Sequence, residues 1–267
     1  TADGYYSQNY IINSAFQVNQ RNYVSAATLA SGSYGFDRWK SGAAGTTLTY
    51  TSAPQGQLVT MNSGGVIQQV IERQNISAGI YTLSWKGTAT GRVYNFGSTP
   101  PPYSDSGVVV TLDGLANVVV EIAAVSADKT LGFAQLESGA VASGFRRNAN
   151  SIQGELATCQ RYYQRITSIT ANAGLISGHQ ITTTESRLLY SPAVVFRVVP
   201  SISVNLCDMS DDVSFASVVS TITMLSGSSP QAPYMFVTHV ASGAAFRPIL
   251  LRGRSASTSF VEFSAEL

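Results

Sequence analysis

The sequence predicts an all-β protein with two antiparallel β-sandwich domains of jelly-roll type, joined by one short α-helix. Short segments that alternate apolar and polar residues recur about every 10–15 residues, with Gly, Ser, Asn and Pro between them. One stretch near the middle of the chain has helical periodicity instead. The 267 residues allow two compact domains of roughly 130 residues each. We expect a first domain at residues 1–150, a linking helix at 151–166 and a second domain at 167–267.

The strands of the first domain are expected where β-branched and aromatic residues alternate with polar ones. Leu83 and Trp85 share one face of such a segment, and Ser84 lies on the other. Trp39 also lies in an alternating segment, so both tryptophans are expected in the core. The expected strands are Tyr10–Val18, Gly35–Lys40, Thr46–Thr51, Gln57–Met61, Val66–Arg73, Ile80–Thr88, Val108–Leu112, Val118–Ala124 and Leu131–Glu137.

A proline-rich loop is predicted at residues 97–107. Three consecutive prolines exclude a central strand and favour an extended polyproline conformation. Tyr103 follows these prolines directly, and Tyr234 also closely follows a proline. Tyr94, Tyr103 and Tyr234 lie at or near loops, where their flat rings are candidates for contact with a sugar. A stiff loop loses little entropy on binding, which favours Tyr103 and Tyr234 as receptor contacts.

The predicted helix covers Glu155–Ile166. Its apolar residues Leu156, Cys159, Tyr163 and Ile166 are spaced 3, 4 and 3 apart, which is the spacing of a heptad seam. A helix of this length is unstable alone, so it must pack on something. Packing of this helix against two further copies of the chain would form a homotrimer, which is the arrangement we expect. Packing of the helix against a domain of the same chain is the alternative.

The second domain is expected to repeat the all-β pattern without repeating the sequence of the first. Its expected strands are Ile166–Ala171, Gly178–Thr184, Arg187–Tyr190, Val194–Val199, Ile202–Leu206, Ser214–Thr223, Tyr234–Val240, Ala245–Leu251 and Ser257–Ala265. Loops are expected at 208–212 and 226–233. Asp208, Asp211 and Asp212 lie close together in the first of these loops, where Asp favours turns. We expect the three aspartates to contact a receptor rather than to hold a metal, because the spacing of a calcium loop is missing.

Composition and charge exclude several classes of protein. Charged residues make up 12% of the chain and the net charge is +1. The sequence also has no basic run that could neutralise nucleic-acid phosphates. No apolar run is long enough to span a membrane, and the first residues do not have the pattern of a secretory signal. Cys159 and Cys207 are expected as buried free thiols. The sequence has no catalytic or metal-binding motif, which predicts neither an enzyme nor a bound cofactor or metal.

Residues 131–166 resemble a junction in phage tail-fibre and receptor-binding proteins, which often carry the pattern QLE.G..A..F..R....EL..CQRYY. The matching residues are Gln135, Leu136, Glu137, Gly139, Ala142, Phe145, Arg146 or Arg147, Glu155, Leu156, Cys159, Gln160, Arg161, Tyr162 and Tyr163. Residues 9–21, 35–39, 69–72 and 82–86 resemble further segments of the same group. In the third of these segments, Val70 stands where the group usually has Arg.

The resemblance implies a trimeric virion protein that is made in the host cytoplasm and binds a glycan or protein on the host cell surface. It also implies that the first domain is similar to carbohydrate-binding β-sandwich modules, and that the second domain is the receptor-binding tip. The expected partners are other tail or capsid proteins of the virion. The protein is not expected to bind nucleic acid or to insert into a membrane. Two alternatives stay open, a capsid-decorating or head-fibre protein and a virion enzyme that depolymerises polysaccharide. The enzyme would need a pair of carboxylates in a groove.

Overall fold

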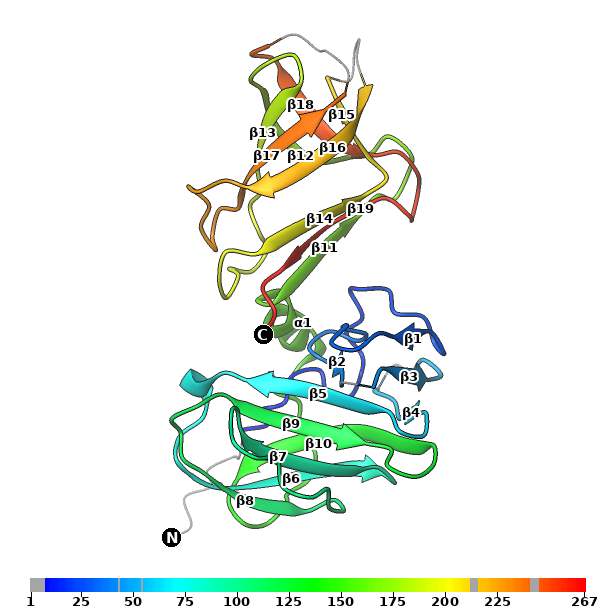
Figure 1. Ribbon diagram of the computed structural model, residues 1–267, viewed down its shortest axis with the longest axis vertical. Coiled ribbons are helices and arrows are strands. Elements are labelled where there is room, and N and C mark those ends of the chain that lie inside the picture. The colour runs from blue at the N-terminus through cyan, green and yellow to red at the C-terminus, as the bar shows by residue number, and fades with distance from the viewer. Residues whose placement is uncertain (1–7, 43, 54, 212–215, 241–244) are drawn as a thin grey trace. The chain divides into compact units, whose positions relative to one another are not determined.

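The computed structural model describes residues 8–42, 44–53, 55–211, 216–240 and 245–267. Over these ranges the chain forms antiparallel strands, one α-helix and one short 3-10 helix, at Arg73–Asn75 (Figure 1). The all-β class predicted from the alternating segments is confirmed. Two compact units divide the chain, Thr1–Cys159 and Gln160–Leu267. The helix expected between two domains therefore belongs to the first unit, apart from its last residue.

The strands described in the first unit form two antiparallel sheets. One sheet has the strand order β1-β3-β4-β10-β6-β8 and the other has the order β2-β5-β9-β7. The strands of the first sheet are β1 (Thr28–Leu29), β3 (Thr46–Thr49), β4 (Val59–Met61), β10 (Lys129–Ser138), β6 (Gly79–Gly87) and β8 (Val108–Leu112). Those of the second are β2 (Lys40–Ser41), β5 (Val66–Ile71), β9 (Val118–Ala123) and β7 (Thr90–Asn95).

A single apolar core draws side chains from both sheets of the first unit. Leu83 and Trp85 of β6 belong to it, as do Val120 and Ile122 of β9. Trp39 is also fully buried in this core, so the expectation for both tryptophans is confirmed. Because strand residues alternate between faces, the residue between Val120 and Ile122 points away from this core. That residue is Glu121.

The strand expected at Tyr10–Val18 is absent from the structure, and turns take its place. Asn13 and Phe16 have positive φ angles of 55° and 52°, which a strand does not allow. The side chain of Asn13 bonds the local backbone instead, because its Nδ2 donates to the carbonyl of Val18 at 2.7 Å and its Oδ1 accepts from the N–H of Val18 at 2.9 Å. An asparagine that closes its own turn in this way competes with strand pairing.

Helix α1 (Ile152–Gln160) starts and ends earlier than predicted. It begins after Ser151, whose Oγ accepts the N–H of Gly154 at 3.0 Å, as an N-cap serine does. The chain then leaves the helix before Tyr163.

The heptad seam predicted for this helix is wrong as a continuous stripe. Tyr163 and Ile166 lie on strand β11 (Tyr163–Thr167), so they do not continue the helical face of Leu156 and Cys159. Aromatic and β-branched residues favour a strand here, and pairing of β11 with the last strand of the chain supplies the tertiary contacts. Within the helix, Cys159 is fully buried and Leu156 is 37% exposed.

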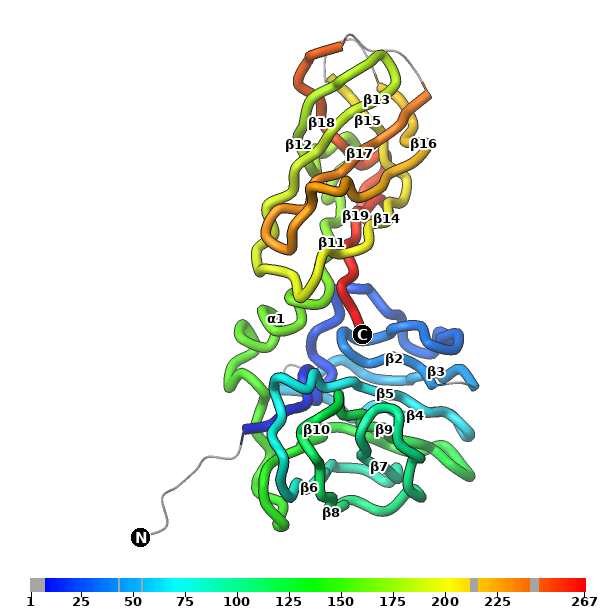
Figure 2. The backbone as a smooth tube through the Cα atoms, turned by 60° about the vertical axis from the view of Figure 1, so that its left-hand side comes forward, coloured from blue at the N-terminus to red at the C-terminus, as the bar shows by residue number. Residues whose placement is uncertain are grey.

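A closed barrel forms most of the second unit in its described residues, with the strand order β12-β13-β17-β16-β15-β18. A separate sheet has the order β11-β19-β14, and β19 runs beside β11 in Figure 2. The barrel strands are β12 (Gly174–Gln180), β13 (Glu185–Leu189), β17 (Tyr234–His239), β16 (Ala216–Met224), β15 (Cys207–Ser210) and β18 (Pro248–Gly253). The other strands are β14 (Ser201–Asn205) and β19 (Phe260–Ser264).

The barrel replaces the β-sandwich that the sequence predicted for this half of the chain. Closure removes the free sheet edges that a sandwich leaves open. One close approach between barrel strands needs glycine, because a Cβ on Gly178 would lie 2.0 Å from the carbonyl oxygen of Arg187. Met209, Met235 and Leu251 are fully buried in the core of this unit. Both cysteines are buried and neither is in a disulfide, as expected.

Candidate functional site

The outer face of the β2-β5-β9-β7 sheet carries a carboxylate that the strand register places between two polar neighbours. Glu121 of β9 pairs with Gln68 of β5 on one side and with Arg92 of β7 on the other. The Oε1 of Glu121 accepts a hydrogen bond from the Nε2 of Gln68, and its Oε2 forms an ion pair with the Nε of Arg92. Only 5% of the Glu121 side chain is exposed, so these two partners replace most of its hydration.

Arg92 connects this carboxylate to two tyrosine rings. Its guanidinium lies 4.2 Å from the ring centroid of Tyr103 and 5.6 Å from that of Tyr94. Both distances are within the range of cation–π attraction. We name these five residues, Gln68, Arg92, Tyr94, Tyr103 and Glu121, the Arg92 cluster.

The proline-rich loop is fastened to β7 at two points. The backbones of Gly91 and Ser104 exchange hydrogen bonds of 2.8 and 2.9 Å. The Nη1 of Arg92 also donates to the carbonyl of Pro101 at 3.1 Å. Tyr103 therefore sits on a stiff segment that is held at both sides, and little of its conformational freedom remains to be lost when a ligand binds.

Burial and charge keep both tyrosines of the Arg92 cluster protonated. Burial, followed by the negative charge of Glu121, raises the pKa of Tyr94 to about 12, and Arg92 opposes this increase. The same causes raise the pKa of Tyr103. Hydrogen bonding to the Glu121 carboxylate contributes to both increases, so both phenols are protonated at neutral pH. Two half-buried aromatic rings beside a guanidinium offer stacking surfaces together with polar groups, which suits a sugar ring.

The structure brings together Tyr94 and Tyr103, which the sequence predicted separately as surface residues. Sequence reasoning missed the three polar members of the Arg92 cluster. The signal for Glu121 was present, since it is the single charged residue in the otherwise apolar strand β9. Gln68 and Arg92 gave no signal because only the pairing of distant strands makes them neighbours of Glu121.

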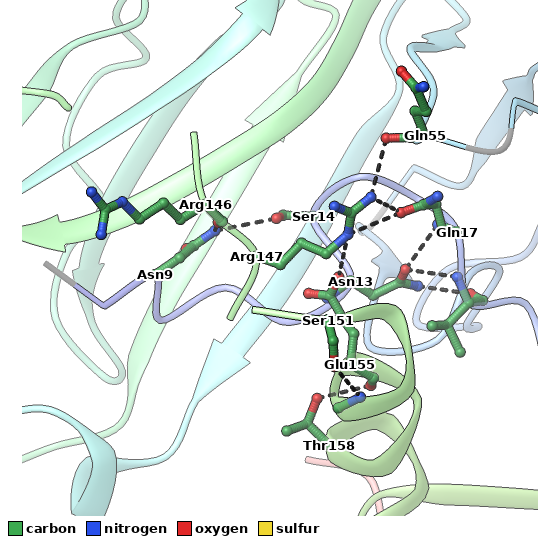
Figure 3. Close-up of polar contacts among 12 residues, drawn as sticks. Asn9, Asn13, Ser14, Gln17, Gln55, Arg146, Arg147, Ser151, Glu155 and Thr158 are labelled. Atoms are coloured by element: carbon green, nitrogen blue, oxygen red, sulfur yellow. Dashed lines mark hydrogen bonds and ion pairs between the residues drawn. The ribbon is translucent and has the colours of Figure 1, made fainter. Parts of the chain in front are cut away.

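A second buried carboxylate, Glu155, lies on α1 and connects this helix to the N-terminal segment (Figure 3). Its Oε1 accepts the backbone N–H of Asn13 at 3.0 Å, and its Oε2 lies 3.6 Å from the Nε of Arg147. The guanidinium of Arg147 also donates to the Oε1 of Gln17 and to the carbonyl of Gln55. Burial raises the pKa of Glu155, although the N–H of Asn13 and the charge of Arg147 counteract this.

The aspartates expected in a receptor-contact loop of the second unit have different settings. Asp208 lies on β15 rather than in a loop, and its Oδ1 is 3.5 Å from the Nε of Arg254. Asp211 follows the strand and pairs with Arg247 at 3.5 Å, with 6% of its side chain exposed. Asp212 lies outside the described residues. The loop prediction is therefore wrong for Asp208, which β15 holds, whereas Asp211 lies just after that strand. Contact of these aspartates with a receptor stays a prediction.

Tyr234 occupies the first position of β17 and is half-buried. The guanidinium of Arg187 lies 5.8 Å from its ring centroid, an arrangement that resembles Arg92 over Tyr94. Tyr234 belongs to the second unit and the Arg92 cluster to the first, so Tyr234 stays a separate receptor-contact prediction. In the part of the chain that the structure describes, no group of three His, Cys, Asp or Glu side chains could hold a metal ion.

Comparisons with known proteins leave the family of this chain open. A scan against models of protein families finds no match, and a search of curated proteins finds no relative. Among the described residues, no helix has both the length and the apolar character needed to cross a membrane.

Proposed function

We propose that this protein is a bacteriophage virion component of the tail-fibre or receptor-binding type, and that it attaches to glycans on the host cell surface. The observation that carries the proposal is the Arg92 cluster, in which two tyrosine rings flank a guanidinium on the outer face of a sheet. The resemblance of residues 9–166 to phage fibre proteins supports the virion context. In this view the two sheets of the first unit form a jelly-roll-like sandwich similar to carbohydrate-binding modules.

The chemistry of the Arg92 cluster favours a sugar over a charged polymer. Glu121 offsets the charge of Arg92, so the cluster has little net charge to attract an anion. Pyranose rings present C–H groups that pack on aromatic faces, and hydroxyls that bond planar polar groups. One such site is weak, and binding by several copies raises the overall affinity. A homotrimer is therefore part of the proposal.

Binding of fluorescently labelled protein to host polysaccharides tests this function. We would measure it on purified bacterial lipopolysaccharides, capsular polysaccharides and teichoic acids. Tyr103→Ala should weaken binding to the recognised polysaccharide by about 1–2 kcal/mol per site, because it removes one of the two rings. Phe96→Ala is the matched control, since Phe96 is 65% exposed next to β7 and lies outside the Arg92 cluster. Equal losses in both variants, or no binding to any polysaccharide, would contradict the proposal.

Light scattering on the purified chain tests the trimer. We expect a mass three times that of the 28.3 kDa chain and a fall to monomer in Leu156→Asp. Leu156 is 37% exposed on α1, so the change adds charge to a surface rather than to the core. Ile152 lies one turn before Leu156 on the same face of α1 and is 39% exposed, so Ile152→Asp should also dissociate the trimer. A monomeric parent protein would remove the trimer from the proposal.

A further inference from the structure

The outer face of the barrel in the second unit carries an arginine between aromatic and polar side chains. Strand β13 lies between β12 and β17 (Figure 1), and its Arg187 is directly opposite His179 on β12 and Phe236 on β17. Tyr234 lies two positions before Phe236. Met235, between these two rings, is fully buried in the core of the unit, so both rings lie on the outside of the barrel. We name His179, Arg187, Tyr234 and Phe236 the Arg187 surface.

Arg187 has no carboxylate partner among the described residues, because none of the ion pairs there includes it. Its guanidinium lies 5.8 Å from the ring centroid of Tyr234, and its Nη1 is 3.5 Å from the Tyr234 hydroxyl. An acidic residue on the same face of β13, Glu185, is two positions away, roughly 7 Å along the strand. The Oε2 of Glu185 accepts a hydrogen bond from the hydroxyl of Thr182 at 3.4 Å. The charge of Arg187 is therefore not neutralised by a neighbouring side chain.

The outer end of the Arg187 guanidinium can be reached by a ligand. Its Nε is enclosed and makes no hydrogen bond to a described residue. Its Nη2 also has no hydrogen-bond partner in the part of the chain that the structure describes, but it is not enclosed. The side chain as a whole is half-buried. Because water is kept from one side of the guanidinium, its attraction for an anion is screened less than at a fully exposed arginine.

The charge and the rings of the Arg187 surface favour an acidic sugar. Glu121 offsets the charge of Arg92 in the first unit, whereas Arg187 can offset one negative charge of a ligand. A carboxylate carries one such charge and accepts two parallel hydrogen bonds from a guanidinium, but a phosphate monoester carries about −1.5 to −2. The half-buried rings of Tyr234 and Phe236 offer apolar surface to the C–H groups of a pyranose. A hexuronic acid combines a pyranose ring with one carboxylate.

We propose that the Arg187 surface is a binding site for a hexuronic acid unit of an acidic polysaccharide. The carboxylate accepts hydrogen bonds from the two Nη atoms of Arg187, and a C–H face of the sugar packs on Tyr234 and Phe236. His179 is exposed on the other side of Arg187, where its ring meets the hydroxyls of the sugar. The site shares no residue with the Arg92 cluster, so it does not rest on the function proposed above.

The test is an NMR titration of the whole isotope-labelled protein with the methyl glycosides of glucuronic, galacturonic and mannuronic acid. At least one of them should shift the ring signals of Tyr234 and Phe236. The uronamide of the same sugar has a neutral amide in place of the carboxylate, and it should bind about tenfold more weakly. Arg187→Gln should remove this preference for the acid. Arg254→Gln is the matched control and should keep it, because Arg254 lies beside Asp208 at 3.5 Å and outside the Arg187 surface.

The comparison of uronate with uronamide in the parent protein needs no substitution, which matters if Arg187→Gln fails to fold. Equal binding of the two sugars, or no shift of these rings with any of the three uronates, overturns the proposal. A folded Arg187→Gln protein that keeps the preference overturns it as well. Tyr103→Ala should leave the titration unchanged, so failure of the Arg92 cluster and failure of this site give different results. Loss of uronate binding in Tyr103→Ala would place the sugar at the Arg92 cluster and overturn the proposal.

Discussion

Glu121 and Glu155 are two buried carboxylates of the same unit, each beside an arginine, and they have different surroundings. Glu121 bonds to the side chains of Gln68 and Arg92 on a sheet face, close to two half-buried tyrosine rings. Glu155 is 0% exposed and bonds to the backbone of Asn13, with Arg147 at 3.6 Å. The first carboxylate fixes Arg92 beside those rings. The second holds the N-terminal segment against the helix. Burial of a carboxylate alone therefore does not mark a functional site, and the partners decide its role.

The largest expected effect is on stability, in Glu155→Ala. This variant leaves the N–H of Asn13 and the guanidinium of Arg147 without their carboxylate, which should lower the free energy of unfolding by about 2–3 kcal/mol, since Arg147 is partly exposed and partly screened. Chemical denaturation followed by circular dichroism measures it. Leu156→Ala, at the next position of α1, is the control and should change stability much less. Equal losses would mean that α1 is sensitive to any substitution and that Glu155 has no special role.

The next largest expected effect is the dependence of stability on pH that Glu155 causes. The pKa of Glu155 is raised by burial above its ordinary value of 4.5, so the folded protein favours its protonated form. The stability linked to this group is fully present below pH 4.5 and is lost as the pH rises through the raised pKa. Relative to Glu155→Gln, the parent protein should therefore gain stability as the pH falls from neutral towards 4.5. Parallel stability curves for the two proteins would contradict the assignment.

The ionisation of Tyr94 gives a smaller but specific effect at the Arg92 cluster. Its pKa of about 12 means that the folded protein favours the protonated phenol, and the associated stability is lost as the pH rises through 12. Several buried tyrosines ionise at high pH, and Tyr94→Phe should remove one of these phases from the difference absorbance of the folded protein. In Glu121→Gln this phase should move to lower pH, because the negative charge of Glu121 is one cause of the increase. If Glu121→Gln has no effect on the phase, the carboxylate does not act on Tyr94.

Part of the fold around these sites could be predicted from the sequence. Alternation within single strands predicted the all-β class and the burial of Trp39 and Trp85, because the faces of a strand depend only on local periodicity. Three consecutive prolines likewise predicted an extended, stiff segment before Tyr103. These predictions needed no knowledge of what the segments contact.

Local periodicity could not predict the extent of the helix or the form of the second unit. Periodicity continued through Tyr163 and Ile166, but pairing of β11 with β19 took these residues out of the helix. The closure of six strands into a barrel depends on which strands meet, and single segments carry little of that information. The expected strand at Tyr10–Val18 was lost to turns that the side chain of Asn13 closes.

By itself, the sequence determined which residues alternate, where proline stiffens the chain, and that charge is scarce, since all of these are properties of neighbouring residues. Only the tertiary structure decided that Gln68 and Arg92 flank Glu121, that Glu155 is enclosed, and that Arg187 lies beside Tyr234 and Phe236. Strand register and burial arise from contacts between segments far apart in the chain. The chemistry of each site depends on those contacts, so it emerged only with the fold.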